Sequence, residues 1–245
     1  FGGSLQNISA TDLSVAAAKA AMESIGLSPD KVDHLILGNV VQSGADAAYV
    51  PRHVGLKLGL PVQVPAYIVN RLCGSGFQSW VNAAQMIMTN ESQCVLAGGV
   101  EQMSQIPYIA RGVRFGGIRL GHSELEDYMT SALTDAYAGI PMAITAENLG
   151  EKYGITRQQV DAYSLQSQTR FKDALGDNKF ADEICSVKIE SKKGTLEITK
   201  DEHPKPDVGM DKLQAMKSIF KKDGLVTAAT ASGIVDGAEL ANHPI

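Results

Sequence analysis

The sequence has only three cysteines, no long apolar run and only a small excess of acidic over basic side chains. The 22 basic and 27 acidic side chains leave a formal net charge of -5, and no block of like charge is long enough to bind a polyanion. No run approaches the ~20 apolar residues of a membrane-spanning helix, and the first residues do not resemble a signal peptide. We therefore expect a soluble protein with no nucleic-acid partner and no membrane span.

The three cysteines also exclude some classes of protein. Cys73, Cys94 and Cys185 lie far apart, are odd in number and lack the spacing of metal ligands. This usage predicts free thiols in a reducing compartment rather than a disulfide framework or a zinc site. We predict no metal ion and no bound cofactor.

Apolar residues are plentiful, at 44% of the 245 residues, which is enough for one large domain or two ordinary ones. Helix-like and strand-like segments alternate over the first hundred residues. The expected helices are 11–25, 46–59 and the residues after 75, and the expected strands are 35–37, 65–70 and 93–99. This alternation predicts an α/β fold with crossover helices and a mostly parallel sheet. Because a helix opens the series, we expect that its first strand is missing.

The alternation of helix-like and strand-like segments stops after Gly99. Residues 103–139 are rich in Gly and Arg and predict a long irregular excursion, followed by helices over 141–154 and 156–176. Short alternating stretches and a Gly/Ala/Thr segment then close the sequence. We predict three parts, namely an α/β domain over 1–103, an α-rich loop domain over 104–222 and a return to the α/β core over 223–245.

The stretch NRLCGSGFQSW, residues 70–80, places Cys73 between a strand-like run and a helix-like run. A helix that begins at residues 74–76 would aim free backbone N–H groups, worth about half a positive charge, at Cys73 and favour the reactive thiolate. Glycines there let the backbone turn sharply, and the Cys73 amide could donate to a developing oxyanion. From these residues alone, a half-buried cysteine in a tight turn is an equally open interpretation.

Four segments in order resemble the successive signatures of the thiolases, which are acyl-CoA:acetyl-CoA acyltransferases. They are NRLCGSGFQSWVNAAQMI, LAGGVEQMSQIPY, PMAITAENL and KKDGLVTAATASGIVDGA. The resemblance covers residues 1 to about 238 and leans toward the mitochondrial 3-ketoacyl-CoA branch of the family. It implies a thiolase-like layered α/β half-fold, with a mostly parallel sheet and crossover helices, plus an α-rich loop domain with CoA contacts.

By this resemblance Cys73 is the nucleophile that takes the acyl group from 3-ketoacyl-CoA as a thioester, before a second CoA thiol collects it. The reverse reaction is a Claisen condensation, and CoA and acyl-CoA are substrates. Met142 matches a methionine that lines the acyl pocket, with a core role equally open. Ala228 and Ser232 match the segment that holds the pantetheine arm of CoA. The candidates for its adenine and phosphate contacts are Lys221, Lys222 and Arg170, for which solvated surface positions are the alternative.

The family pattern also contains a base histidine in Gly-His-Pro and an acid/base cysteine in Cys-x-Gly, and neither occurs in that setting here. We interpret His243 as a coincidental match, Cys94 and Cys185 as buried or inert thiols, and Glu101 as structural. The TAGN of many members is TAAT at 227–230. We therefore expect that the C-terminal thiolase domain is absent and that these residues alone turn over little substrate.

Three functions stay open at this point. The favoured one is a truncated thiolase of fatty acid β-oxidation, and the second is a non-catalytic thiolase-like protein that binds acyl-CoA or a partner. A cysteine hydrolase is disfavoured, because none of the five histidines lies in a recognisable catalytic motif. The resemblance further implies a homodimer or homotetramer in the complete form and a mitochondrial location, with peroxisomal or cytosolic locations as alternatives.

Overall fold

The computed structural model describes residues 1–117, 120–191 and 194–241. The chain forms two compact units, each of which is described by itself. Unit 1 contains Phe1–Pro107, Cys185–Lys200 and the described residues from Ile234 onward, and unit 2 contains Tyr108–Ile184 and Asp201–Gly233. The boundaries differ from the predicted parts, since Cys185–Lys200 joins unit 1.

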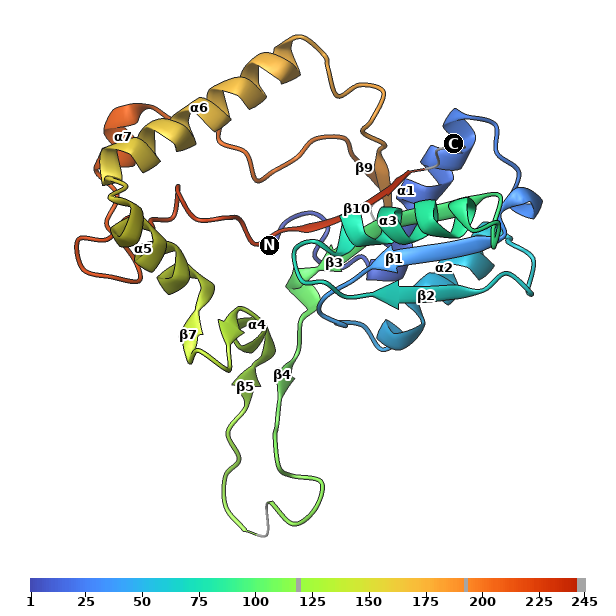
Figure 1. Ribbon diagram of the computed structural model, residues 1–245, viewed down its shortest axis with the longest axis horizontal. Helices are drawn as coiled ribbons and strands as arrows, with labels where there is room; N and C mark the ends of the chain where they lie inside the picture. Colours follow the sequence, from blue (N-terminus) through green and yellow to red (C-terminus); the bar gives the residue numbers. More distant parts are fainter. Residues whose placement is uncertain (118–119, 192–193, 242–245) are drawn as a thin grey trace. The chain divides into compact units, whose positions relative to one another are not determined.

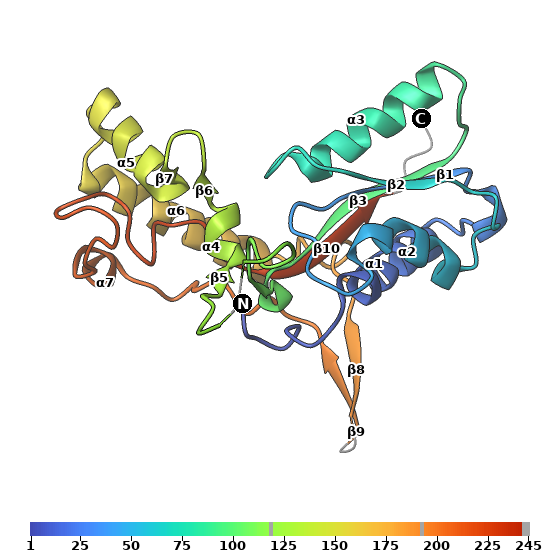
Figure 2. The ribbon, with the colours of Figure 1, turned by 90° about the horizontal axis from the view of Figure 1, so that it is seen from below.

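Unit 1 is built on a four-stranded sheet in the order β10-β3-β1-β2 (Figure 1). Its parallel strands are β1 (His34–Gly38), β2 (Ala66–Val69) and β3 (Val95–Gln102). The fourth strand, β10 (Asp236–Ala241), is antiparallel to β3. Figure 2 shows α3 on one face of the sheet and α1 and α2 on the other. The helices are α1 (Ala10–Ser24), α2 (Val50–Leu58) and α3 (Ser75–Met88). The prediction of an α/β fold with a mostly parallel sheet is confirmed.

Strand β1 divides the hydrophobic core between the two faces of the sheet. Leu35 and Leu37 belong to the cluster beneath α1 and α2, whereas Ile36 belongs to the cluster that includes Ala83 of α3. All three β1 side chains are fully buried. Burial of a side chain of this size contributes about 1.5–3 kcal/mol, so both faces of the sheet hold it in the centre of unit 1.

Two boundaries in unit 1 differ from the sequence prediction. The helix expected over 46–59 is a 3-10 turn, Ala47–Tyr49, followed by α2, where Pro51 is the second helical residue. A proline there loses no helical hydrogen bond, because the first amides of a helix have no intrahelical acceptor. Strand β3 runs three residues beyond the expected end at Gly99, because Val100 pairs with Ala238 and Gln102 pairs with Asp236 of β10.

The remaining strands of unit 1 are β8 (Val187–Ser191) and β9 (Gly194–Ile198), which form an antiparallel hairpin. The sequence indicated both as short alternating stretches. Both strands lie within the residues predicted as the loop domain, but in the structure they group with unit 1. In the described parts of the chain, no helix is both long and apolar enough to cross a membrane.

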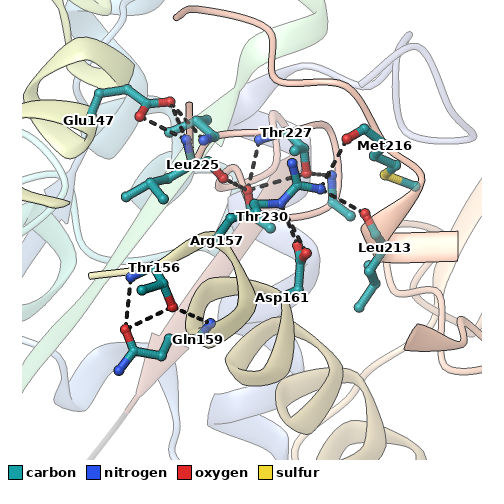
Figure 3. Close-up of polar contacts among 12 residues, drawn as sticks. Glu147, Thr156, Arg157, Gln159, Asp161, Leu213, Met216, Leu225, Thr227 and Thr230 are labelled. Atoms are coloured by element: carbon teal, nitrogen blue, oxygen red, sulfur yellow. Dashed lines mark hydrogen bonds and ion pairs between the residues drawn. The ribbon is translucent and has the colours of Figure 1, made fainter. Parts of the chain in front are cut away.

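Unit 2 is rich in helices. The two long ones lie where the sequence predicted them and are α5 (Met142–Tyr153) and α6 (Arg157–Gly176). Helix α6 begins with a capping box, in which the side chains of Thr156 and Gln159 each accept from the other's backbone amide (Figure 3). The shorter elements are α4 (Tyr128–Ala132), α7 (Met210–Gln214), β4 (Tyr108–Ile109), β5 (Glu126–Asp127), β6 (Thr134–Asp135) and β7 (Ile140–Pro141).

Candidate active site

Cys73 lies between the end of β2 and the start of α3. Its side chain is exposed, and the next residue, Gly74, is the N-cap of α3. The position is at the carboxyl ends of three parallel strands, which is where open α/β sheets bind their ligands. The Cys73 thiol is therefore exposed to solvent rather than half-buried.

The residue before Cys73 has a backbone conformation that is rare outside glycine. Leu72 has φ 51°, in the left-handed region, at a cost of about 1–2 kcal/mol for a residue with a Cβ. Its amide donates to Asn70 Oδ1 at 3.0 Å, and its carbonyl oxygen accepts from Ser75 Oγ at 2.6 Å. These two contacts hold the turn that presents Cys73.

The first turn of α3 leaves backbone donors beside Cys73. The first helical hydrogen bond is donated by the Gln78 amide to the carbonyl oxygen of Gly74 at 2.9 Å. The amides of Gly76 and Phe77 donate to no acceptor among residues 1–117, 120–191 and 194–241. Such free amides form the positive end of the helix dipole, which attracts a thiolate or an oxyanion.

Two glycines of the sheet let α3 begin directly on its strands. A Cβ atom on Gly38, at the end of β1, would lie 2.5 Å from the Ser75 carbonyl carbon and 2.7 Å from the Gly76 nitrogen. A Cβ atom on Gly99 of β3 would lie 3.3 Å from the Gly76 Cα. The sequence showed these glycines only as strand ends, and their contact with the cysteine turn is visible only in the structure.

Glu101 connects the strand ends to this turn, which the sequence analysis did not foresee. Its carboxylate accepts hydrogen bonds from the amides of Val40 and Val41, at 3.0 and 2.9 Å, and from Asn39 Nδ2 at 3.2 Å. The carbonyl oxygen of Val40 accepts from Asn70 Nδ2 at 3.2 Å. Burial raises the pKa of Glu101, and the amide donors oppose this shift. The sequence showed only that a polar residue, Glu101, follows an apolar strand, and not which amides it would meet.

The other two thiols are each half-buried rather than fully buried. Burial raises the pKa of Cys94, whose amide faces the carboxylate of Asp33. Cys185 Sγ lies 3.9 Å from the carbonyl oxygen of Ala16. His243 lies outside the described residues. Within the described ranges, no cluster of three or more His, Cys, Asp or Glu residues could hold a metal ion.

The other predicted site residues belong to unit 2, so the structure describes them separately from Cys73. Met142 is the first residue of α5 and is 47% exposed in this chain. Ala228 and Ser232 follow Leu225 in the chain, and both are exposed. Both residues are thus accessible to a ligand.

The three basic candidates differ in their surroundings. Lys221 Nζ lies 2.8 Å from Glu151 Oε2 of α5, and this hydrogen bond raises the pKa of the lysine. Lys222 is exposed beside it along the chain, and Arg170 is exposed on α6. In the part of the chain that the structure describes, neither of these two has an ion-pair partner. Their charges are therefore available to an anionic ligand.

Comparison with known proteins gives one family. The family model for the N-terminal domain of thiolase matches residues 1–241. Mitochondrial 3-ketoacyl-CoA thiolase from Homo sapiens is 50% identical over 239 residues, which are 97% of this chain and 60% of the relative. A probable acetyl-CoA acyltransferase from Staphylococcus aureus (strain COL) is 42% identical over 242 residues, which are 98% of this chain and 61% of the relative.

Solved structures agree with the sequence relatives. The crystal structure of human mitochondrial 3-ketoacyl-CoA thiolase matches with a TM-score of 0.95 and 48% identity, over 99% of this chain and 61% of the human one. The complex of the human enzyme with CoA matches with a TM-score of 0.92 and 49% identity, over 99% and 60% of the two chains. The chain thus spans about 60% of the length of the relatives it matches. It belongs to the thiolase family.

Proposed function

We propose that this chain carries the nucleophile of a thiolase that cleaves 3-ketoacyl-CoA with CoA, giving acetyl-CoA and a shortened acyl-CoA. The observation that supports this most directly is the exposed Cys73 beside the free amides at the start of α3. Relatives about half identical to this chain are named 3-ketoacyl-CoA thiolase, and the more distant ones acetyl-CoA acyltransferase. The mitochondrial names of the first relatives favour a mitochondrial location.

In the proposed reaction, the Cys73 sulfur attacks the C3 carbonyl of 3-ketoacyl-CoA. The C2–C3 bond breaks, its electron pair leaves with acetyl-CoA as a carbanion that takes up a proton, and the acyl group stays on sulfur as a thioester. The thiol of CoA then attacks the thioester, and Cys73 leaves as the thiolate. The free amides near Cys73 are suited to the oxyanion of each addition.

The residues for which we propose contacts with acyl-CoA belong to unit 2. We assign Met142 to the acyl chain, the backbone of Ala228 and the Ser232 hydroxyl to the pantetheine arm, and the basic side chains to the phosphates. The last group comprises Lys221, Lys222 and Arg170. Their exposure supports the assignment, and CoA is bound by the matching human structure. The residues that move the protons are expected in Gly-His-Pro and Cys-x-Gly segments, which these 245 residues do not contain.

A non-catalytic acyl-CoA-binding protein is the second candidate, favoured by the exposed basic side chains of Lys222 and Arg170, which suit the phosphates of such a ligand. The intact mass of the chain after incubation with acetoacetyl-CoA separates the two candidates. Without the residues that move the protons, we expect only slow formation of an acetyl adduct, on the wild type and on Cys94→Ala but not on Cys73→Ala. CoA binding without any adduct would favour the binding protein. A folded chain with neither adduct nor binding would contradict both.

A further inference from the structure

The buried carboxylate of Glu147 holds the backbone of the segment that leads to Ala228 and Ser232. Its side chain lies on α5, five residues after Met142, and is only 3% exposed. Oε1 accepts hydrogen bonds from the amides of Leu225 and Val226 at 2.9 and 2.8 Å, and Oε2 accepts from Leu225 at 2.8 Å (Figure 3). Charge-assisted hydrogen bonds of this kind are about twice as strong as neutral ones.

The packing around this contact leaves space for no other side chains. A Cβ atom on Gly224 would lie 2.5 Å from Glu147 Oε1, so the carboxylate reaches the backbone only because residue 224 is glycine. A Cβ atom on Gly150, one turn further along α5, would lie 2.1 Å from Leu225 Cδ1. The two glycines therefore let the 224–226 segment lie directly on α5.

Beyond Val226 the chain forms a turn with its own hydrogen bonds. The Thr227 amide donates to Thr230 Oγ1 at 2.8 Å, and that hydroxyl donates to the carbonyl oxygen of Leu225 at 3.0 Å (Figure 3). The amide of Ala231 donates to the carbonyl oxygen of Thr227 at 2.9 Å. The turn is held by its own hydrogen bonds, and Thr227 is fully buried. The position of its exposed residues therefore depends on the contact of Leu225 and Val226 with Glu147.

We propose that Glu147 is a positioning residue for CoA, acting through the amides of Leu225 and Val226. It fixes the exposed turn that carries Ala228 and Ser232 relative to Met142, which lies on the same helix. The inference rests on the proposed function, because that function assigns the turn to the pantetheine arm. A small misplacement of a binding group far from the reacting atoms can be costly, so loss of this anchor weakens CoA binding without changing Cys73.

Two variants remove the contact in different ways. Glu147→Gln places an N–H₂ group where Oε2 now accepts from the Leu225 amide, so two donors face each other. Gly224→Ala keeps the carboxylate but inserts a methyl group into its contact with the backbone. The matched control is Asp173→Asn, which removes the same charge from an exposed position on α6.

Calorimetric titration of the full chain with CoA tests the inference. We expect Kd to rise by about tenfold, or about 1.4 kcal/mol, in both variants and to stay at the wild-type value in the control. Acetylation of Cys73 by phenyl thioacetate, which lacks the pantetheine arm, should keep its wild-type rate in all variants. The effects of the two substitutions should not add in the double variant, since both break one contact.

If the folded variants bind CoA as tightly as the wild type, the positioning role of Glu147 is overturned, but the proposed function is not. If the wild type itself bound no CoA and formed no acetyl adduct, the proposed function would fall and this inference with it. A general loss of structure would slow acetylation by phenyl thioacetate as well, which also counts against a positioning role. If both variants fail to fold, hydrogen exchange of the wild type decides, since rapid exchange of the Leu225 and Val226 amides contradicts the anchor.

Discussion

The hydroxyl of Ser75 donates a hydrogen bond of 2.6 Å to the carbonyl oxygen of Leu72, across the residue that we assign as the nucleophile. The Ser75 hydroxyl oxygen also accepts a hydrogen bond from the Arg71 amide at 2.9 Å, and Ser75 is only 4% exposed. One buried serine thus holds both arms of the turn around Cys73. The left-handed Leu72 depends on this contact and on Asn70.

We predict that Ser75→Ala lowers the free energy of unfolding by about 1–3 kcal/mol, because two backbone groups lose a buried partner. The acylation of Cys73 should slow as well. Urea unfolding and intact-mass kinetics measure the two effects. Ser24→Ala is the control, since that exposed hydroxyl also donates to a backbone carbonyl, that of Ala21 at 2.8 Å. An equal loss in both variants would show that burial at Ser75 has no special effect.

Gly38→Ala should destabilise unit 1 by about 3 kcal/mol, since the new methyl group meets backbone atoms that cannot move independently. The clash is with the start of α3, at 2.5 Å from the Ser75 carbonyl carbon. Gly176→Ala is the control, because no atom lies within 4 Å of a Cβ there and the residue ends α6. We expect that control to be as stable as the wild type or slightly more so. A neutral Gly38→Ala variant would mean that α3 can shift off β1.

Arg157→Met should lower the stability of unit 2 by about 3–5 kcal/mol, because it leaves the carboxylate of Asp161 buried and unpaired. The guanidinium lies 2.9 Å from Asp161 Oδ1 and donates to the carbonyl oxygens of Leu213 and Met216 at 2.8 and 3.0 Å (Figure 3). The Asp161 side chain is only 2% exposed. Urea unfolding measures the loss.

The control for that experiment is Lys19→Met, which breaks an exposed ion pair with Glu23 at the same sequence spacing. Such a pair contributes about 0.5 kcal/mol or less. Adding Asp161→Asn to Arg157→Met should recover part of the lost stability, since the amide carries no charge. A double variant that is no more stable than Arg157→Met would indicate that the carbonyl contacts, rather than the ion pair, carry the effect.

Asp46 should make the stability of unit 1 depend on acid pH. Hydrogen bonds from His53 and Thr11, in that order of size, lower the pKa of Asp46 from its usual 3.8. The folded state therefore binds fewer protons, so the contribution is complete above the unfolded pKa and is lost as the pH falls through the folded one. The wild type should exceed Asp46→Asn in unfolding free energy at neutral pH, and this gap should shrink between about pH 5 and pH 3.

Asp173→Asn serves as the control for the acid series, because it removes an exposed carboxylate that has no hydrogen-bond or ion-pair partner among the described residues. Its unfolding free energy should follow that of the wild type at every pH. A gap between wild type and Asp46→Asn that stays constant down to acid pH would contradict the assigned cause. Buffers of equal ionic strength are needed, since screening changes exposed charge interactions.

The sequence was sufficient to locate Cys73 at a strand-to-helix junction, because apolar periodicity fixes strands and long helices. It did not predict α7, whose five residues are too short to show a helical period. Nor did it show what Glu101 and Glu147 do, because both act through backbone amides of residues distant in the chain. Side-chain types do not indicate which amides will be near. The sequence also left the exposure of Met142 open, because a local pattern does not show which residues pack over the start of α5.

The pairing of β10 with β3 also bears on how the chain is made. Val100 and Ala238 pair across more than a hundred intervening residues, most of which belong to unit 2. A ribosome adds about 5–20 residues per second, so the outer edge of β3 waits on the order of ten seconds for its partner. During that time an unpaired strand edge is open to other chains. Unit 1 therefore depends on unit 2 being synthesised first, and chaperone binding at this edge would protect the nascent chain.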